Sequence, residues 1–231
     1  VSGIVVPGGF GYRGVEGMID TVRYARENQI PYLGLCLGMQ VMVIEAARNL
    51  LGKKDANSTE FDQMTDNPVI DLMPDQVGVT EKGGTMRLGV YPCEILGEGA
   101  TSRAYGGSET VIMERHRHRF EFNNSFKDRL ASVGLVASGV SPDGKLVEIV
   151  EHEDHPFMAG TQFHPEFLSR PTRPHPMFRE FVGVICEGAS STFNGADIST
   201  NGGDGTNDMD LETDTNLKDF RGNQASSTTN G

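Results

Sequence analysis

Residues 31–40 read Pro-Tyr-Leu-Gly-Leu-Cys-Leu-Gly-Met-Gln, a short apolar run that reaches a cysteine between two glycines and then continues with helical periodicity. Small residues two positions before and after Cys36 let the backbone turn sharply from a strand into a helix, so the side chain projects from the sheet edge. At the first turn of a helix, backbone N–H groups and the dipole lower a thiol pKa. The pattern Gly34-x-Cys36-x-Gly38 therefore predicts a nucleophile, with a buried structural cysteine as the alternative.

Strands and helices alternate on both sides of this turn. Val1–Val6 is an apolar run that stops at Pro7-Gly8-Gly9, and apolar residues at helical spacing follow over residues 15–28. The strand expected at Tyr32–Leu35 is followed by a second apolar helical face from Met39 to Leu50. This order predicts an α/β fold with a mostly parallel, doubly wound sheet and helices on both faces. Ligands bind at the carboxyl ends of such strands, where the glycine loop and the cysteine both lie.

The middle of the chain, residues 53–107, is rich in turns, and we expect loops and antiparallel strands there. A strand at Thr110–Met113 is expected to lead into ERHRHR at 114–119, for which substrate recognition and structural ion pairing are both open interpretations. A metal site is disfavoured because no third ligand stands nearby. Residues 135–140 and 145–150 flank a Ser-Pro-Asp-Gly turn, which predicts a hairpin.

The last strand is expected at Met158–Phe163 and ends in His164-Pro165-Glu166. In an extended backbone residues two positions apart point to the same side, so the Glu166 carboxylate reaches the His164 ring. A nucleophilic thiol needs a base, and the base needs a carboxylate that fixes its tautomer. Together with Cys36 at the same sheet edge, this pair predicts a Cys-His-Glu triad, with a surface histidine beside an acid as the alternative.

Composition limits the function classes. The 231 residues are 37% apolar, which is enough for a sizeable core, and the net charge of −12 argues against a nucleic-acid partner. No apolar run approaches the length of a membrane span, so we expect no membrane partner and a cytoplasmic location. The three cysteines are scattered, which predicts free thiols. We expect a folded domain at 1–187 that is truncated at its N-terminus, and a disordered acidic tail at 188–231.

Two stretches resemble the triad-type (class I) glutamine amidotransferases, namely GLCLGMQ at 34–40 and QFHPEF at 162–167. Four further stretches resemble the members of that family in which an attached synthetase domain uses the ammonia to aminate UTP: PGGFGYRG at 7–14, ANSTEF at 56–61, GGTMRLG at 83–89 and ERHRHRFE at 114–121. The resemblance covers about residues 1–186 and implies the amidotransferase fold for them.

The resemblance also implies roles for individual residues. It implies that Cys36 attacks the side-chain amide of glutamine, that His164 protonates the departing ammonia and then activates water, and that Glu166 orients His164. Backbone N–H groups of Gly8 and Leu37 would hold the oxyanion. The glutamine pocket would be formed by Gly9, Gln40, Glu60 and Arg119. Glu60 would bind the α-ammonium group of glutamine and Arg119 would bind its α-carboxylate. Charge alone would also allow other acid–base pairs of this chain to bind these two groups.

For the full-length enzyme the resemblance implies that ATP and Mg²⁺ are bound and that GTP acts as an allosteric activator. For this domain it implies no cofactor. The sequence contains no phosphate-loop motif. The implied partners are L-glutamine, the synthetase domain and, at full length, further copies in a homo-oligomer. Alone, the domain is expected at most to hydrolyse glutamine. Two alternatives stay open: another triad amidotransferase or γ-glutamyl hydrolase, which the stretches around Glu60 and Arg119 disfavour, and a regulatory module with a vestigial triad.

Overall fold

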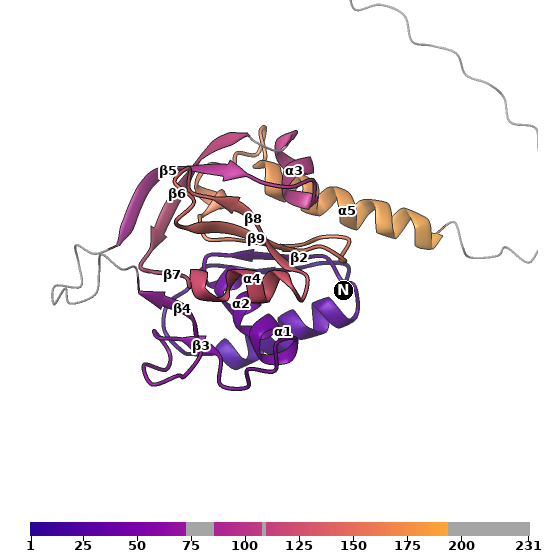
Figure 1. Ribbon diagram of the computed structural model, residues 1–231. Coiled ribbons are helices and arrows are strands. Elements are labelled where there is room, and N and C mark those ends of the chain that lie inside the picture. Colours follow the sequence, from indigo (N-terminus) through magenta and orange to yellow (C-terminus); the bar gives the residue numbers. More distant parts are fainter. Residues whose placement is uncertain (73–85, 108–109, 194–231) are drawn as a thin grey trace, which may run out of the picture. The chain divides into compact units, whose positions relative to one another are not determined.

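The computed structural model describes residues 1–72, 86–107 and 110–193, which form two sheets and several helices (Figure 1). The strand order of the large sheet is β1-β2-β10-β9-β8-β5-β6, and that of the small sheet is β3-β4-β7. The strands of the large sheet are β1 (Ile4–Val6), β2 (Tyr32–Leu35), β5 (Arg87–Ile95), β6 (Val111–His118), β8 (Leu135–Val140), β9 (Val147–His152) and β10 (Met158–Thr161). The small sheet contains β3 (Asn57–Ser58), β4 (Pro68–Leu72) and β7 (Phe120–Phe122). The α-helices are α1 (Val15–Glu27), α2 (Leu37–Asn49), α3 (Ala100–Tyr105), α4 (Lys127–Ala131) and α5 (Pro176–Phe193).

The large sheet is mixed. β2 pairs in parallel with β1 on one side and with β10 on the other. The remaining pairings described for this sheet are antiparallel: β10 with β9, β9 with β8, β8 with β5, and β5 with β6. The α/β class is therefore confirmed, but the sheet is not mostly parallel as expected. The predicted hairpin turn explains part of the difference, because β8 and β9 are joined directly and need no crossover helix.

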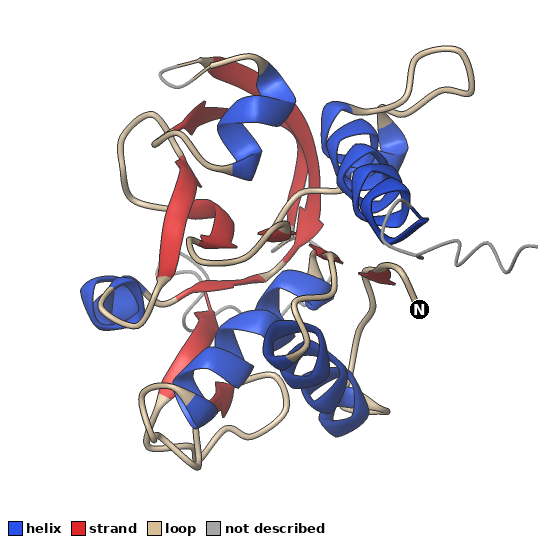
Figure 2. Ribbon diagram, turned by 90° about the vertical axis from the view of Figure 1, so that its right-hand side faces the viewer, coloured by secondary structure: helices blue, strands red, loops and turns tan. Residues whose placement is uncertain are grey.

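Helices cover both faces of the large sheet, as predicted; Figure 1 shows α1 and α2 on one face and α3 and α5 on the other, and Figure 2 shows them from a second side. Strand β2 explains the arrangement, since successive side chains point to opposite faces. Tyr32 packs in the cluster formed with α1 and α2, whereas Leu33 packs in the cluster formed with α3 and α5. All four residues of β2 are buried, which is typical of a strand covered on both faces.

The helix predicted over 15–28 is α1, and its buried residues follow the predicted periodicity: Val15, Ile19, Val22 and Ala25. One charge on this helix is used inside the protein. Arg26 donates to the buried carboxylate of Glu45 on α2 at 2.7 Å, so the acid is not left unpaired. This contact and the apolar face together fix α1 against α2.

Four local expectations need correction. The first strand begins at Ile4 rather than Val1, and the strand predicted at 110–113 continues as β6 to His118. The short helix α3 was not expected; Glu151 accepts hydrogen bonds from the Thr101 N–H and hydroxyl, so a distant residue stabilises its first turn. α5 continues to Phe193, beyond the tail boundary expected at residue 188. The rest of the predicted tail, and the start of the GGTMRLG stretch, lie outside the described residues.

Candidate active site

Cys36 occupies the sharp turn between β2 and α2. Its φ of 51° and ψ of −99° lie in a region that residues with side chains rarely adopt. A side chain on Gly34 would meet the Gly38 backbone at 2.4 Å, and one on Gly38 would meet the Val6 carbonyl oxygen at 2.2 Å. The Cys36 N–H donates to the Thr161 carbonyl at 2.7 Å, which ties the turn to β10. Close backbone approach therefore requires both glycines, as the elbow pattern predicted.

His164 follows β10, and its Nδ1 lies 2.7 Å from Glu166 Oε1. Because a carboxylate only accepts, Nδ1 carries the proton and Nε2 carries the lone pair in the neutral ring. The Nε2 atom is buried and has no hydrogen-bond partner in the described part of the protein. The Phe167 ring stacks on the imidazole with 5.2 Å between centroids and so helps to fix its plane. The ring is thus oriented and has one nitrogen ready to take a proton.

The backbone around Glu166 differs from the expectation. Pro165–Phe167 is one turn of 3₁₀-helix rather than an extended segment, yet the carboxylate still reaches the His164 ring. Burial alone would raise the pKa of Glu166, but the hydrogen bond with His164 brings that pKa below its ordinary value. The carboxylate is therefore ionised at neutral pH and stabilises a positive charge on the imidazole.

Gly8, in the loop after β1, brings the cysteine and the histidine together. A Cβ atom built on Gly8 would lie 2.8 Å from His164 Cε1 and 3.5 Å from Cys36 Cβ. A side chain on Gly8 would therefore crowd the His164 ring and contact Cys36, and a glycine at this position leaves room for them. The structure places the predicted nucleophile and the predicted base, which are far apart in sequence, at one point on the sheet edge.

The Cys36 thiol has a pKa raised to about 12, mainly because it is buried. The N–H of Leu37 lowers this pKa, but three surrounding carboxylates raise it further: Glu121, Glu166 and Glu60. The prediction that the helix start lowers the thiol pKa is thus wrong in its net direction, because burial outweighs the backbone donor. Burial therefore favours the neutral thiol over the thiolate.

A pocket of about 150 Å³ opens beside Cys36, which is small compared with the ~300–1,000 Å³ of drug-sized ligand sites. Four of its lining residues are the predicted glutamine-binding residues: Gly9, Gln40, Glu60 and Arg119. The loop after β1 is tied to this pocket, because the Gly11 N–H donates to Glu60 Oε1 at 2.9 Å. The structure therefore brings the predicted substrate residues to the same place as the cysteine.

The stretch ERHRHR is mainly the strand β6, so its residues alternate between buried and exposed. His116 Nδ1 lies 2.8 Å from His118 Nε2, and burial, followed by the charge of Arg87, lowers the pKa of the two histidines to about 2 and about 3. Arg87 in turn donates to the buried Glu148 carboxylate at 2.6 Å. Of the two open interpretations, structural pairing describes these buried histidines, although His118 also lines the small pocket.

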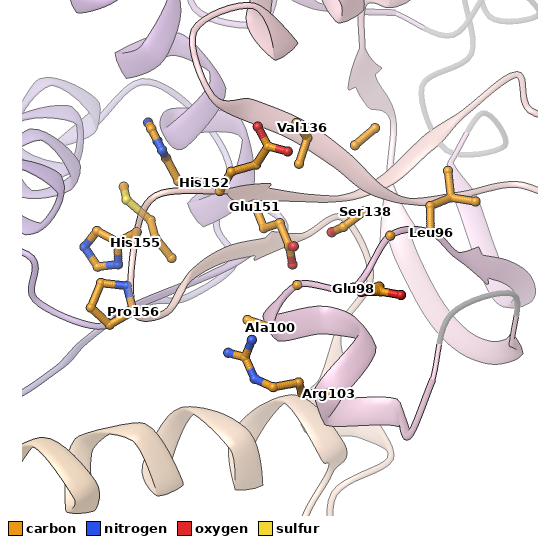
Figure 3. A pocket seen from close by; sticks show the side chains of 15 residues that line it. Leu96, Glu98, Ala100, Arg103, Val136, Ser138, Glu151, His152, His155 and Pro156 are labelled. Carbon is orange, nitrogen blue, oxygen red and sulfur yellow. The ribbon is translucent and has the colours of Figure 1, made fainter.

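A larger pocket of about 640 Å³ lies between the start of α3 and the ends of β8 and β9 (Figure 3). It contains none of the predicted site residues. Its Glu151 carboxylate is held by the Thr101 N–H at 3.0 Å and the Thr101 hydroxyl at 2.7 Å. Size alone therefore does not select the site, whereas the convergence of nucleophile, base and acid does.

Gln162 was not among the predicted site residues, yet its amide nitrogen lies 3.6 Å from Cys36 Sγ. The sequence held a usable signal, because Gln162 precedes His164 by two positions and residues so spaced along a strand share a side.

Among the described residues, no helix is long and apolar enough to cross a membrane.

Residues 1–184 match the glutamine amidotransferase class-I family, and the chain belongs to this family. More particularly, it is similar to proteins named CTP synthase. One from Dehalococcoides mccartyi is 65% identical over 184 residues, and one from Caldanaerobacter subterraneus subsp. tengcongensis is 62% identical. Each alignment covers 80% of this chain and 34% of the relative, so the chain spans about a third of their length.

A solved structure supports the same assignment. The Trypanosoma brucei CTPS glutaminase domain with bound acivicin is 39% identical, with a TM-score of 0.75, and the match covers 80% of this chain and 71% of that one. The resemblance read from the motifs is therefore confirmed at the level of family and fold.

Proposed function

We propose that this chain hydrolyses the side-chain amide of L-glutamine and releases ammonia, with Cys36 as nucleophile. The observation that carries the proposal is the meeting of Cys36 and the His164–Glu166 pair at Gly8. The similarity to a glutaminase domain supports the same reaction. The roles below are those that the family resemblance implies, and the geometry and general acyl-transfer chemistry support them.

In the first step the Cys36 sulfur attacks the amide carbon of glutamine while His164 Nε2 takes the thiol proton. Because burial raises the thiol pKa, the sulfur needs this base to become nucleophilic. The ionised Glu166 stabilises the imidazolium that results. Backbone N–H groups of Gly8 and Leu37 hold the oxyanion of the tetrahedral intermediate.

In the second step the imidazolium of His164 gives its proton to the leaving nitrogen, and ammonia departs from a thioester on Cys36. Water then attacks the thioester carbon while His164 removes a proton from it. Collapse of the second tetrahedral intermediate releases glutamate and returns the proton to the sulfur. No further reactant is needed for this cycle.

The small pocket provides the groups that free glutamine requires. Glu60 would pair with the α-ammonium and Arg119 with the α-carboxylate, while Gly9 and Gln40 complete the walls. Fixing both charged ends of the substrate places its side-chain amide next to the sulfur.

For the full-length protein we propose that the ammonia is used by a synthetase domain, which aminates UTP to CTP with ATP and Mg²⁺ and is activated by GTP. The names of the relatives support this proposal. We also propose that residues 1–187 act as the glutaminase unit. Mixing this chain with a separately produced synthetase domain, UTP and ATP is expected to yield CTP only when glutamine is present.

The proposed hydrolysis is tested by measuring glutamate and ammonia release from L-glutamine. Cys36→Ala is expected to lower the rate at least ~10³-fold, because a covalent nucleophile cannot be replaced by its neighbours. Cys186→Ser is the matched control, because this thiol is exposed on α5, and it is expected to retain the rate of the unaltered chain. Equal activity of Cys36→Ala and the unaltered chain would overturn the proposal.

A further inference from the structure

Gln162 connects the pocket to the sulfur, although the proposed reaction assigns it no role. It follows β10 directly and is fully buried. Its amide nitrogen lies 3.6 Å from Cys36 Sγ, and its amide oxygen lies 3.3 Å from Gln40 Nε2. A buried side chain with polar atoms at both of these positions links a wall of the pocket to the reacting atom.

The orientation of the Gln162 amide follows from its neighbours. The Phe120 carbonyl oxygen, which can only accept, lies 3.3 Å from one amide atom of Gln40, so that atom is the nitrogen. The same nitrogen faces Gln162, which must therefore present its oxygen to Gln40. The Gln162 nitrogen is left to face the sulfur, and a sulfur accepts hydrogen bonds from an N–H.

We propose that Gln162 is a positioning residue for Cys36, whose amide donates to the sulfur and, through Gln40, couples the orientation of that sulfur to the substrate pocket. The proposal deepens the proposed glutamine hydrolysis and rests on it for its functional meaning. The hydrogen bond itself is a property of the resting protein and can be measured without substrate.

The surroundings of the sulfur explain why such a donor matters. Three carboxylates disfavour negative charge on Cys36, namely Glu60, Glu121 and Glu166. The Leu37 N–H is the backbone donor to the sulfur. Gln162 supplies a second N–H from another element, and an N–H donor stabilises a thiolate more than a thiol.

Two substitutions of Gln162 distinguish the loss of its hydrogen-bond donor from the loss of its side-chain packing. Gln162→Met keeps a side chain of similar length but removes the amide, and Gln162→Glu keeps an acceptor toward Gln40 but turns the donor into a carboxylate. The rate of Cys36 alkylation by iodoacetamide is measured against pH by peptide mass spectrometry, with Cys186 as the internal standard because it is exposed. Iodoacetamide reacts with the thiolate and not with the thiol, so the alkylation rate reports the fraction of Cys36 that is deprotonated. Because the pKa of Cys36 is raised to about 12, the alkylation rate at a fixed pH near neutral is proportional to the small thiolate fraction, and we expect this rate to fall about tenfold in Gln162→Met and further in Gln162→Glu.

Ser138→Ala is the matched control, because Ser138 is also buried in the large sheet but contacts Thr101 instead of the sulfur. It is expected to leave the Cys36 alkylation rate near neutral pH unchanged. An unchanged rate in both folded Gln162 variants would overturn the inference, as would an equal loss of rate in Ser138→Ala. If Gln162→Met does not fold, as judged by its unfolding transition, Gln162→Glu decides alone.

The kinetic readout separates this inference from the proposed function. If both hold, Gln162→Met lowers kcat for glutamate release about tenfold with a smaller change in KM, because the sulfur and not the substrate loses a partner. A lowered alkylation rate in the Gln162 variants of a chain that releases no glutamate would support the hydrogen bond and overturn the proposed glutaminase activity. Glutamate release that is unaffected in both Gln162 variants would overturn the inference alone.

Discussion

Two pairs of side chains with the same spacing behave differently in this protein. His164 and Glu166, after β10, form a histidine–carboxylate pair whose second ring nitrogen is left without a partner in the described residues. His116 and His118, on β6, form a buried histidine–histidine pair beside the Arg87 charge, and His116 Nε2 likewise has no hydrogen-bond partner in the described residues. The carboxylate of the first pair would stabilise a protonated ring, whereas burial and a nearby cation lower the pKa values of the second pair.

The comparison shows that spacing alone does not determine chemistry. Both motifs place two polar side chains two positions apart, and both end at the same edge of the large sheet. What differs is the nearest partner and the burial. The His164 ring is hydrogen-bonded to a carboxylate at 2.7 Å, which stabilises an imidazolium. Carboxylates lie only 3.7 and 3.5 Å from the two rings on β6, whose pKa values are lowered first by burial and then by the Arg87 guanidinium. The surroundings of each histidine, supplied by distant strands, decide between a proton carrier and a structural contact.

The sharpest test of this difference substitutes one histidine from each pair. His164→Ala is expected to lower the rate of glutamate release by ~10²–10⁴-fold, because the base that receives the thiol proton is removed. His116→Gln is expected to change the rate far less, because its ring lies behind the pocket wall. Steady-state kinetics on both variants check the prediction, and a larger loss in His116→Gln would contradict it.

A second test targets the cation of the buried network. Arg87→Met is expected to destabilise the protein by ~3–5 kcal/mol, because Glu148 is left buried without its charged partner. The free energy of unfolding is measured in denaturant. Arg23→Met is the matched control, since Arg23 makes an ion pair with Asp20 that is largely exposed, and a change below ~0.5 kcal/mol is expected there. Similar losses in the two variants would argue that the network is unimportant for stability.

A third test concerns the turn that positions Cys36. Gly38→Ala is expected to cost ~3 kcal/mol or more and to lower activity, because the added methyl group would meet the Val6 carbonyl at 2.2 Å. Gly17→Ala is the matched control, since a methyl group there meets nothing within 4 Å and the residue lies inside α1. It is expected to stabilise the protein by ~0.5–1 kcal/mol. Thermal unfolding of both variants distinguishes the two positions.

The smallest expected effect is a pH dependence of stability. His116 and His118 have lowered pKa values in the folded protein, so their contribution is present above about pH 6.5 and is lost as the pH falls. Glu121 and Glu148 have raised pKa values, so their contribution has the opposite sign and is lost as the pH rises. Replacing one histidine separates the histidine contribution to the pH dependence of stability from the contribution of the carboxyl groups.

Between about pH 6.5 and about pH 4.5, the free energy of unfolding of the unaltered chain is therefore expected to fall more steeply than that of His116→Gln. The difference in slope approaches ~1.4 kcal/mol per pH unit, the value for one proton. Denaturant unfolding at several pH values measures both slopes. Parallel curves would show that His116 takes up its proton in the folded and unfolded states alike.

Local patterns in the sequence predicted the parts of the fold that short-range rules govern. The strand Tyr32–Leu35, the helix that begins near residue 15 and the hairpin around residues 141–144 follow from apolar periodicity and turn residues. The glycines at positions 34 and 38 likewise predicted a sharp turn, and in the structure the backbone of Gly34 lies close to that of Gly38, and the backbone of Gly38 lies close to that of Val6.

Other features of the fold depend on contacts between residues that are far apart in the sequence, so local sequence patterns could not predict them. The first turn of α3 is held by Glu151, and the antiparallel pairing of β5 with β8 joins strands that are far apart in the sequence, which no local pattern encodes. The site shows the same limit. Motifs predicted Cys36 and His164, but the direction of the thiol pKa depends on burial and on carboxylates from several elements, which only the folded structure reveals.

The central claim is that Cys36 and His164 act together on a substrate held in the small pocket. Labelling with a chloroketone analogue of glutamine tests it most directly, with the adduct located by peptide mass spectrometry. We predict a single adduct on Cys36, formed much more slowly in His164→Ala and suppressed by excess L-glutamine. Labelling that falls mainly on the exposed Cys186, or that proceeds equally fast without the His164 ring, would contradict the account.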